Sequence, residues 1–199
     1  MSTVHVFYND CDQDIQTLFH DKNNELCPEG YDTVPSMNEY YIASHNPTGS
    51  DLVFEKPHVD GPFAFLPFTL KRCIYVLQGN KNIRTNIFST GFSKVLGANE
   101  HVMFDYNREL HNIEYIVPEG DEKPDESDRI VLKLHFVKKQ FMYKYFAKLN
   151  SYWNRFARHI FVASKTPQTA YEHSLAYVIN GSTSAYAELM NTYSSFMRR

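Results

Sequence analysis

Between Leu52 and Val137 the chain alternates short β-favouring runs with turn-forming residues, and this pattern leaves few architectures open. Turn signals such as Gln78-Gly79-Asn80 and Leu96-Gly97-Ala98-Asn99 separate neighbouring runs. Short strands at this spacing are typical of an all-β sandwich or barrel. We expect strands over Leu52–Glu55, Phe63–Phe68, Arg72–Leu77, Ile83–Ser89, His101–Tyr106, Ile113–Val117 and Arg129–Val137.

The segments on either side of this region follow other patterns. Before it, Val4–Tyr8 predicts a strand, residues 12–21 predict a short helix, and the polar remainder up to Gly49 predicts loops. At 199 residues the chain needs only one core, so we expect a β domain over residues 1–137 and a helical extension packed on it over 138–199. The extension is predicted from apolar residues at helical spacing, namely Tyr145, Leu149, Tyr152, Trp153, Phe156 and Ile160, and from a second helical region over Thr169–Arg198.

Composition argues against several classes of protein. A formal net charge of −3 gives no reason to expect nucleic acid or an anionic membrane as a partner. No apolar run reaches the roughly 18 residues of a membrane span, and the first residues lack the pattern of a secretory signal, so we expect an intracellular, cytoplasmic protein. Cys11, Cys27 and Cys73 are odd in number and lack a Cys-x-x-Cys spacing, which predicts reduced thiols.

His58, Asp60 and His111 form a candidate metal site. His58 and Asp60 are two positions apart, so on an extended strand both side chains point to the same side. His111 would then return from another strand of the same sheet or barrel. Two histidines and one carboxylate on one face of an octahedron leave positions of a non-haem Fe(II) open for a co-substrate and O2. Because the chain has 9 histidines, the alternative is a chance pair that forms only a turn or a hydrogen-bonded surface contact.

The order of motifs after Pro57 carries a family resemblance. Pro57-His58-x-Asp60-Gly61-Pro62 is followed by Leu70–Leu77, by Phe104-Asp105 with His111 shortly afterwards, and by Arg129–Leu132. Over Pro57–Val137 this order resembles the aspartyl/asparaginyl β-hydroxylase branch of the Fe(II)- and 2-oxoglutarate-dependent dioxygenases. The resemblance implies a mainly β fold with helices, built as a double-stranded β-helix (jelly roll, cupin-like) with the C-terminal helical segment packed on it.

The resemblance also implies roles for individual residues. His58 and His111 would bind Fe(II), and Asp60 would complete the ligand set of the wider superfamily, whereas the β-hydroxylase branch often lacks this carboxylate. Arg129 would bind the distal carboxylate of the co-substrate 2-oxoglutarate, with Arg72 as a second basic anchor, because a guanidinium can hold a carboxylate through two hydrogen bonds. If the acidic stretch 118–128 is not a hairpin insertion, Lys133 is the alternative anchor. No catalytic residues are expected beyond the metal ligands, and the implied substrate is a protein side chain or an amino-acid-like molecule.

Residues 129–137 offer a check that does not depend on the resemblance. Odd positions, which include Arg129 and Lys133, are largely polar, whereas the even positions are all apolar. A polar inner face and an apolar outer face covered by the helices after residue 138 would suit a barrel with a pocket. The alternative is that Arg129 and Lys133 face water.

Other functions remain compatible with the sequence. The same fold could serve as a catalytically silent scaffold or complex subunit that docks a protein partner through its C-terminal helices. It could also be a metal-binding cupin that acts without 2-oxoglutarate, in which case neither Arg129 nor Arg72 should line the metal pocket. The acidic stretch 118–128 is either a solvated hairpin tip or a lid over the substrate.

Overall fold

The computed structural model describes residues 4–46, 55, 57–60, 70–117, 123–149 and 152. These residues form two antiparallel sheets and two α-helical segments, so the expectation of a mainly β fold with helices is confirmed. In the larger sheet the strand order is β1 (Val4–Phe7), β3 (Glu39–Ala43), β9 (Arg129–Lys138), β4 (Leu70–Gln78) and β7 (His101–Asp105), and β2 (Tyr31–Thr33) also pairs with β9. In the smaller sheet the order is β6 (Phe92–Val95), β5 (Ile83–Ile87) and β8 (His111–Tyr115).

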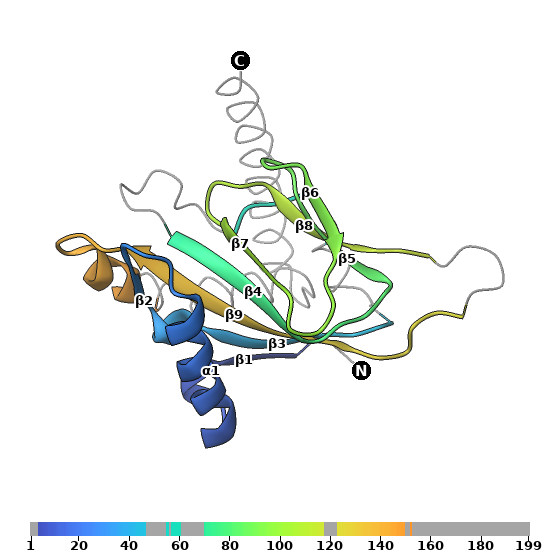
Figure 1. Cartoon of the computed structure of the whole chain (residues 1–199), viewed down its shortest axis with the longest axis horizontal. Coiled ribbons are helices and arrows are strands. Elements are labelled where there is room, and N and C mark those ends of the chain that lie inside the picture. Colours follow the sequence, from blue (N-terminus) through green and yellow to red (C-terminus); the bar gives the residue numbers. More distant parts are fainter. Residues whose placement is uncertain are drawn as a thin grey trace, which may run out of the picture.

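The inner faces of the two sheets share one apolar core. Figure 1 shows the long strands β4 and β9 side by side in the larger sheet, with β5, β6 and β8 grouped at one side of it. Side chains at alternate positions of each strand enter this core, as the pleat requires. From the larger sheet they include Tyr41, Leu70, Ile74, Val76 and Val131, and from the smaller one Ile83 and Ile87.

Helix α1 (Gln13–Leu26) covers the outer face of the larger sheet. It begins where the Asp12 carboxylate accepts a hydrogen bond from the Ile15 N–H at 2.9 Å, and it runs beyond the predicted end at residue 21. Phe19 is fully buried and belongs to a second core with outer-face residues of β4 and β9, namely Cys73, Tyr75, Leu132, Leu134 and Phe136. Three of the apolar even positions of β9, Leu132, Leu134 and Phe136, therefore pack with this N-terminal helix, which was not predicted to cover them. The prediction that the helices after residue 138 cover this face falls largely on residues outside the described ones.

The region predicted as loops up to Gly49 contains two strands and a short 3-10 helix, Pro35–Met37. β3 carries the β-favouring run Tyr40-Tyr41-Ile42, and it forms because β1 and β9 supply hydrogen-bond partners on both of its edges. β6 was also not predicted. The predicted strand at residues 113–117 instead begins at His111. The predicted strands over 52–55 and 63–68 lie outside the described residues, except that Glu55 is described in a 3-10 conformation.

After β9 the described chain forms a helix over residues 143–149. Ala147 is fully buried in the core between the sheets, and Tyr143 packs against that core. In contrast, three members of the predicted apolar stripe are exposed: Tyr145 at 73%, Leu149 at 66% and Tyr152 at 61%. The helical prediction for the rest of 153–199 lies outside the described residues.

Two smaller expectations can be compared with the structure. Cys11, Cys27 and Cys73 are free thiols, as predicted. Within the described part of the chain, no helix has the length and apolarity that crossing a membrane would need.

Candidate metal centre

The backbone brings His58 beside His111. The two residues exchange a pair of hydrogen bonds, with each N–H 2.9 Å from the carbonyl oxygen of the other, so segment 57–60 lies along the free edge of β8. The Asp60 N–H then donates to the Tyr106 carbonyl at 2.9 Å. Directly opposed residues of an antiparallel pair point to the same face. As a result, the centroids of the two imidazole rings are 4.7 Å apart.

The three predicted ligands come together around one point. Asp60 Oδ1 is 3.5 Å from His58 Nε2, and Asp60 Oδ2 is 3.5 Å from His111 Nε2. One ligand atom from each residue can be chosen so that all three lie within 4.8 Å of one another. Ligand atoms at 90° around a metal with bonds of about 2.1 Å are about 3 Å apart. Small rotations of the side chains would therefore give the geometry of a metal site.

The protonation of His111 suits a metal ligand. Its Nδ1 is 2.8 Å from the Glu109 carbonyl, which can only accept, so Nδ1 carries the proton and Nε2 presents a lone pair. Burial lowers the pKa of His111, although the nearby Asp60 carboxylate acts in the opposite direction. The imidazole is therefore neutral at pH 7, and the ring of Phe104, 4.7 Å from the His111 ring, covers one side of it.

Asp60 is held as a carboxylate. Burial disfavours its charged form, but the charge of the Arg72 guanidinium outweighs burial and holds the pKa of Asp60 well below its ordinary value. Arg72 Nη1 donates directly to Asp60 Oδ2. Arg72 was predicted as a second anchor for the co-substrate, but in the structure its guanidinium is bound to one of the predicted ligands.

Among the described residues, Arg129 is the largest side chain that is fully buried, with 2% of its surface exposed. Its Nη2 donates to Thr85 Oγ1 at 3.0 Å, whereas its Nε has no hydrogen-bond partner. Among the described residues, no carboxylate forms an ion pair with it. Burial lowers the pKa of Arg129 to about 10, which still leaves the group charged at pH 7. The alternative that Arg129 faces water was wrong.

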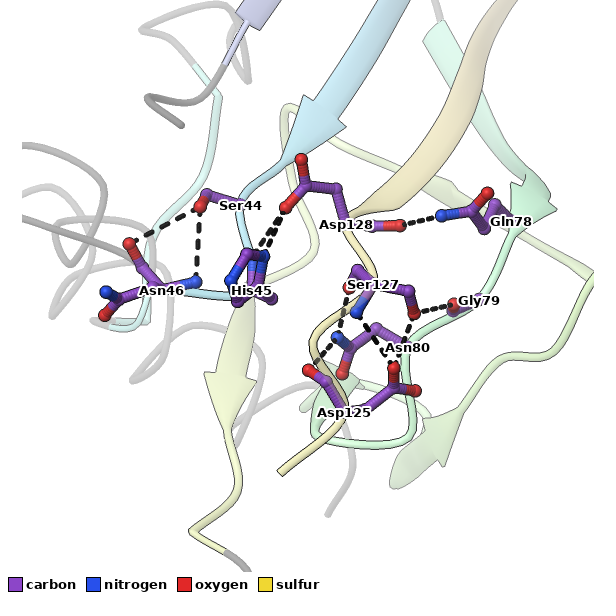
Figure 2. A network of polar contacts seen from close by, with 9 residues as sticks. All are labelled: Ser44, His45, Asn46, Gln78, Gly79, Asn80, Asp125, Ser127 and Asp128. Carbon is purple, nitrogen blue, oxygen red and sulfur yellow. Dashed lines mark hydrogen bonds and ion pairs between the residues drawn. The ribbon is translucent and has the colours of Figure 1, made fainter. Parts of the chain in front are cut away.

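A network of hydrogen bonds fixes the start of β9 and therefore the position of Arg129 (Figure 2). Asp128 Oδ1 accepts from the His45 N–H at 3.0 Å, and Nδ1 of the same histidine is 2.7 Å away. Gln78 Nε2 donates to the Asp128 carbonyl at 2.8 Å. Asn80 Nδ2 donates to the carbonyls of Asp125 and Ser127. The described end of the acidic stretch, residues 123–128, is thus tied to the chain between β4 and β5.

Lys133, the alternative anchor, is engaged elsewhere on the same inner face. Its Nζ is 3.6 Å from Glu39 Oε2 and 4.2 Å from the centroid of the Tyr41 ring. Burial disfavours the charged form of Glu39, but Lys133 and a hydrogen bond from His5 outweigh it, so the pKa of Glu39 lies well below its ordinary value. Of the two predicted anchors on β9, Arg129 is the one that has no acidic partner in the described part of the chain.

Sequence reasoning missed three residues that support these side chains. Thr85 is the hydrogen-bond acceptor for Arg129, His135 is the acceptor for Arg72, and Tyr106 lies beneath the Arg72 guanidinium. Strand alternation gave a signal for His135, which lies two positions from Lys133, and for Thr85, which lies between Ile83 and Ile87. Tyr106 follows β7 in a turn, where alternation gives no signal.

Comparisons with known proteins add no family assignment. No family model matches the chain, and no curated protein matches it. Among solved structures, a transcriptional regulator of the HTH_3 family from Vibrio cholerae aligns with 14% sequence identity and a TM-score of 0.28. The alignment covers 60% of this chain and 61% of the regulator. A similarity of this size does not establish a shared fold.

Proposed function

We propose that the chain is an Fe(II)- and 2-oxoglutarate-dependent dioxygenase that hydroxylates a protein side chain or an amino-acid-like substrate. The observation that carries the proposal is the buried guanidinium of Arg129 on the inner face of β9, which has no acidic partner among the described residues. A buried charge is costly unless it is paired, so Arg129 indicates an anionic ligand. One alternative that the sequence left open is a metal-binding cupin that acts without 2-oxoglutarate. Such a protein would not need Arg129.

The positions of Arg129 and of the cluster suit a five-carbon dicarboxylate. Arg129 binds Thr85, which is two residues from Ile87 on β5, and Ile87 is the cross-strand partner of His111. Two strand residues span about 7 Å. The end carbons of 2-oxoglutarate are roughly 5 Å apart in the extended chain, given C–C bonds near 1.5 Å. One carboxylate could thus reach Arg129 while the 2-oxo acid end lies at His58, Asp60 and His111.

The strand order supports a jelly roll as the scaffold. When segment 57–60 is counted as a strand beside β8, the antiparallel pairs are β3 with β9, segment 57–60 with β8, β4 with β7, and β5 with β6. These are the pairs of one long hairpin, and successive pairs alternate between the two sheets. Folding a long antiparallel ribbon over itself in this way produces a jelly roll. The metal cluster and Arg129 would then lie inside it.

The residues present fit the implied cofactors. His58, Asp60 and His111 would hold Fe(II), and Arg129 with Thr85 would hold the distal carboxylate of 2-oxoglutarate. Bound iron would supply the oxidation of a C–H bond by O2, coupled to the oxidative decarboxylation of 2-oxoglutarate to succinate. The chain itself keeps His111 in the metal-binding tautomer through the Glu109 carbonyl, and the Phe104 ring excludes water from one side of that imidazole.

Anaerobic titration tests the proposal. Fe(II) added to the protein with 2-oxoglutarate should give a metal-to-ligand charge-transfer absorption band, because the 2-oxo acid chelates the metal. His111→Ala should remain folded and lose the band, whereas His101→Ala should keep it, since His101 is an exposed residue on β7. Folded wild-type protein without the band would contradict the proposal.

A catalytically silent scaffold or complex subunit remains the second candidate, and one observation favours it. Large apolar side chains are exposed after β9, with Phe141 at 89% and Tyr145 at 73%. Exposed apolar surface of this kind often marks a contact with another protein. A subunit of this kind would bind neither Fe(II) nor 2-oxoglutarate, so the same titration separates the two functions.

A further inference from the structure

Arg72 is held beside the metal cluster by contacts on three sides. Its Nη1 donates to Asp60, its Nε donates to His135 Nε2 at 3.0 Å, and its guanidinium carbon lies 4.3 Å from the centroid of the Tyr106 ring. Its exposed fraction is 7%. Because Nε can only donate, His135 Nε2 must be the acceptor, so His135 is neutral with its proton on Nδ1. Arg72 is therefore a fixed positive charge next to a predicted metal ligand.

The charges around the cluster do not balance once a metal enters. Among the described residues that approach it, Asp60 carries one negative charge, and Arg72 and Arg129 carry one positive charge each. Glu39 and Lys133 pair with each other and cancel. A divalent cation therefore enters a buried region that already has an excess of positive charge. Charges a few ångströms apart interact strongly where water is largely excluded, so Arg72 opposes binding of the cation.

We propose that Arg72 makes tight binding of the divalent metal conditional on an anionic co-ligand. A dicarboxylate brings two negative charges, one toward Arg129 and one toward the metal and Arg72, and it lowers the net charge of the occupied region from +3 to +1. Coupling between two ligands is reciprocal, so the metal also strengthens binding of the dicarboxylate. This role of Arg72 rests on the metal site of the proposed function, and it assigns to Arg72 a positioning and charge-setting role in place of the predicted anchor role.

The coupling can be measured with Mn(II) as the metal and 2-oxoglutarate as the anion. Calorimetric titration of Mn(II) into wild-type protein should give affinity that rises by at least about tenfold when 2-oxoglutarate is saturating. The coupling factor is the ratio of the Mn(II) affinities with and without saturating 2-oxoglutarate. In Arg72→Gln, Mn(II) alone should bind about tenfold more tightly than to wild-type protein, and this factor should fall by about tenfold. Any coupling in wild-type protein beyond this tenfold should remain in Arg72→Gln, because 2-oxoglutarate also chelates the metal directly.

Arg72→Lys is the matched control, because it keeps the charge while losing the planar fork. It should behave like wild-type protein in the coupling measurement. Circular dichroism checks the fold of each variant, and Arg72→Met replaces the glutamine variant if the latter does not fold. An unchanged coupling factor in the neutral variant, or weaker binding of Mn(II) alone, overturns the role of Arg72 while leaving the metal site in place. If wild-type protein binds no Mn(II) under either condition, the metal site and this role fail together.

Discussion

The buried guanidinium of Arg129 distinguishes a residue kept for ligand binding from one kept for stability. A structural arginine pairs with a carboxylate, and its removal leaves that partner unpaired and costs stability. In the described part of the chain, Arg129 instead donates to a neutral hydroxyl and its Nε has no hydrogen-bond partner, so the folded protein should lose little stability when the charge is removed.

We therefore expect Arg129→Met to separate binding from stability. Its affinity for 2-oxoglutarate, measured by calorimetry in the presence of Mn(II), should fall by more than about 30-fold, because charge-assisted hydrogen bonds to a carboxylate are lost. Its unfolding temperature should equal or exceed that of wild-type protein. Thr85→Val provides the graded control, and it should lower the affinity for 2-oxoglutarate only a few-fold. A large loss of stability with unchanged affinity would show that Arg129 is structural.

Glu39 is the opposite case, a residue whose charge stabilises the fold. Glu39→Gln leaves the partly buried Lys133 ammonium without its carboxylate, which should lower the free energy of unfolding by about 3 kcal/mol at pH 7. The double variant Glu39→Gln/Lys133→Met should recover much of this loss, because both partners are then neutral. Urea unfolding measures both effects, and equal losses in the single and double variants would contradict the pairing.

The same pair predicts a pH dependence with a definite sign. Since the pKa of Glu39 is lower in the folded protein than its unfolded value of about 4.3, its contribution is fully present above that value. The contribution is lost as the pH falls toward and through the folded pKa. The stability difference between wild-type protein and Glu39→Gln should thus be constant from pH 6 to 7 and shrink below about pH 4. A difference that grows on acidification would reverse this assignment.

At the scale of elements, α1 determines how the outer face of the larger sheet is covered. Phe19→Ala should lower the free energy of unfolding by about 3 to 5 kcal/mol, because a fully buried ring against β4 and β9 is replaced by a cavity. Thr17→Ala, on the exposed side of the same helix, should change it by less than about 0.5 kcal/mol. Similar losses in the two variants would mean that α1 is not packed as described.

The network before β9 links a loop to the position of Arg129. Asn80→Ala removes the donors to the carbonyls of Asp125 and Ser127, which should loosen this end of the strand (Figure 2). We expect faster amide hydrogen exchange over residues 125–130 and weaker binding of 2-oxoglutarate. Glu126→Ala, in the same loop but exposed, should change neither quantity. Unaltered exchange in Asn80→Ala would show that the network does not hold the strand.

Periodicity predicted those elements whose side chains alternate strongly, and it failed where partners supply the stability. β9 was predicted because its odd and even positions differ in polarity, but that alternation left open whether Arg129 faces the core or water, and the structure places it in the core. β3 was missed because its short run, which begins with Glu39, is stabilised by pairing on both edges rather than by local pattern. The packing of α1 on the outer face was not predicted, since an apolar face does not specify which apolar element covers it.

In the candidate site too, local pattern was predictable and contacts between distant segments were not. The period of two placed His58 and Asp60 on one side, and motif order indicated His111, but the pairing of segment 57–60 with β8 required coordinates. The contact between Arg72 and Asp60 could not be predicted, because the sequence gives no cross-strand register for residues outside regular strands.

For the whole molecule, the site should couple ligand binding to global stability. Ligands that bind only the folded state raise its stability, and cooperative ligands raise it by more than the sum of their separate effects. Mn(II) and 2-oxoglutarate together should therefore raise the unfolding temperature by more than the two added singly, and His111→Ala should abolish the increase. Purely additive shifts in wild-type protein would contradict a shared site.

The most direct measurement of the metal site is anomalous X-ray scattering from crystals of the protein grown with Mn(II) as a stand-in for Fe(II). We expect one strong anomalous peak bonded to His58 Nε2, His111 Nε2 and an Asp60 carboxylate oxygen at about 2.0 to 2.2 Å. Crystals of folded protein that show no peak there at saturating Mn(II), or a peak bonded to other residues, would contradict it.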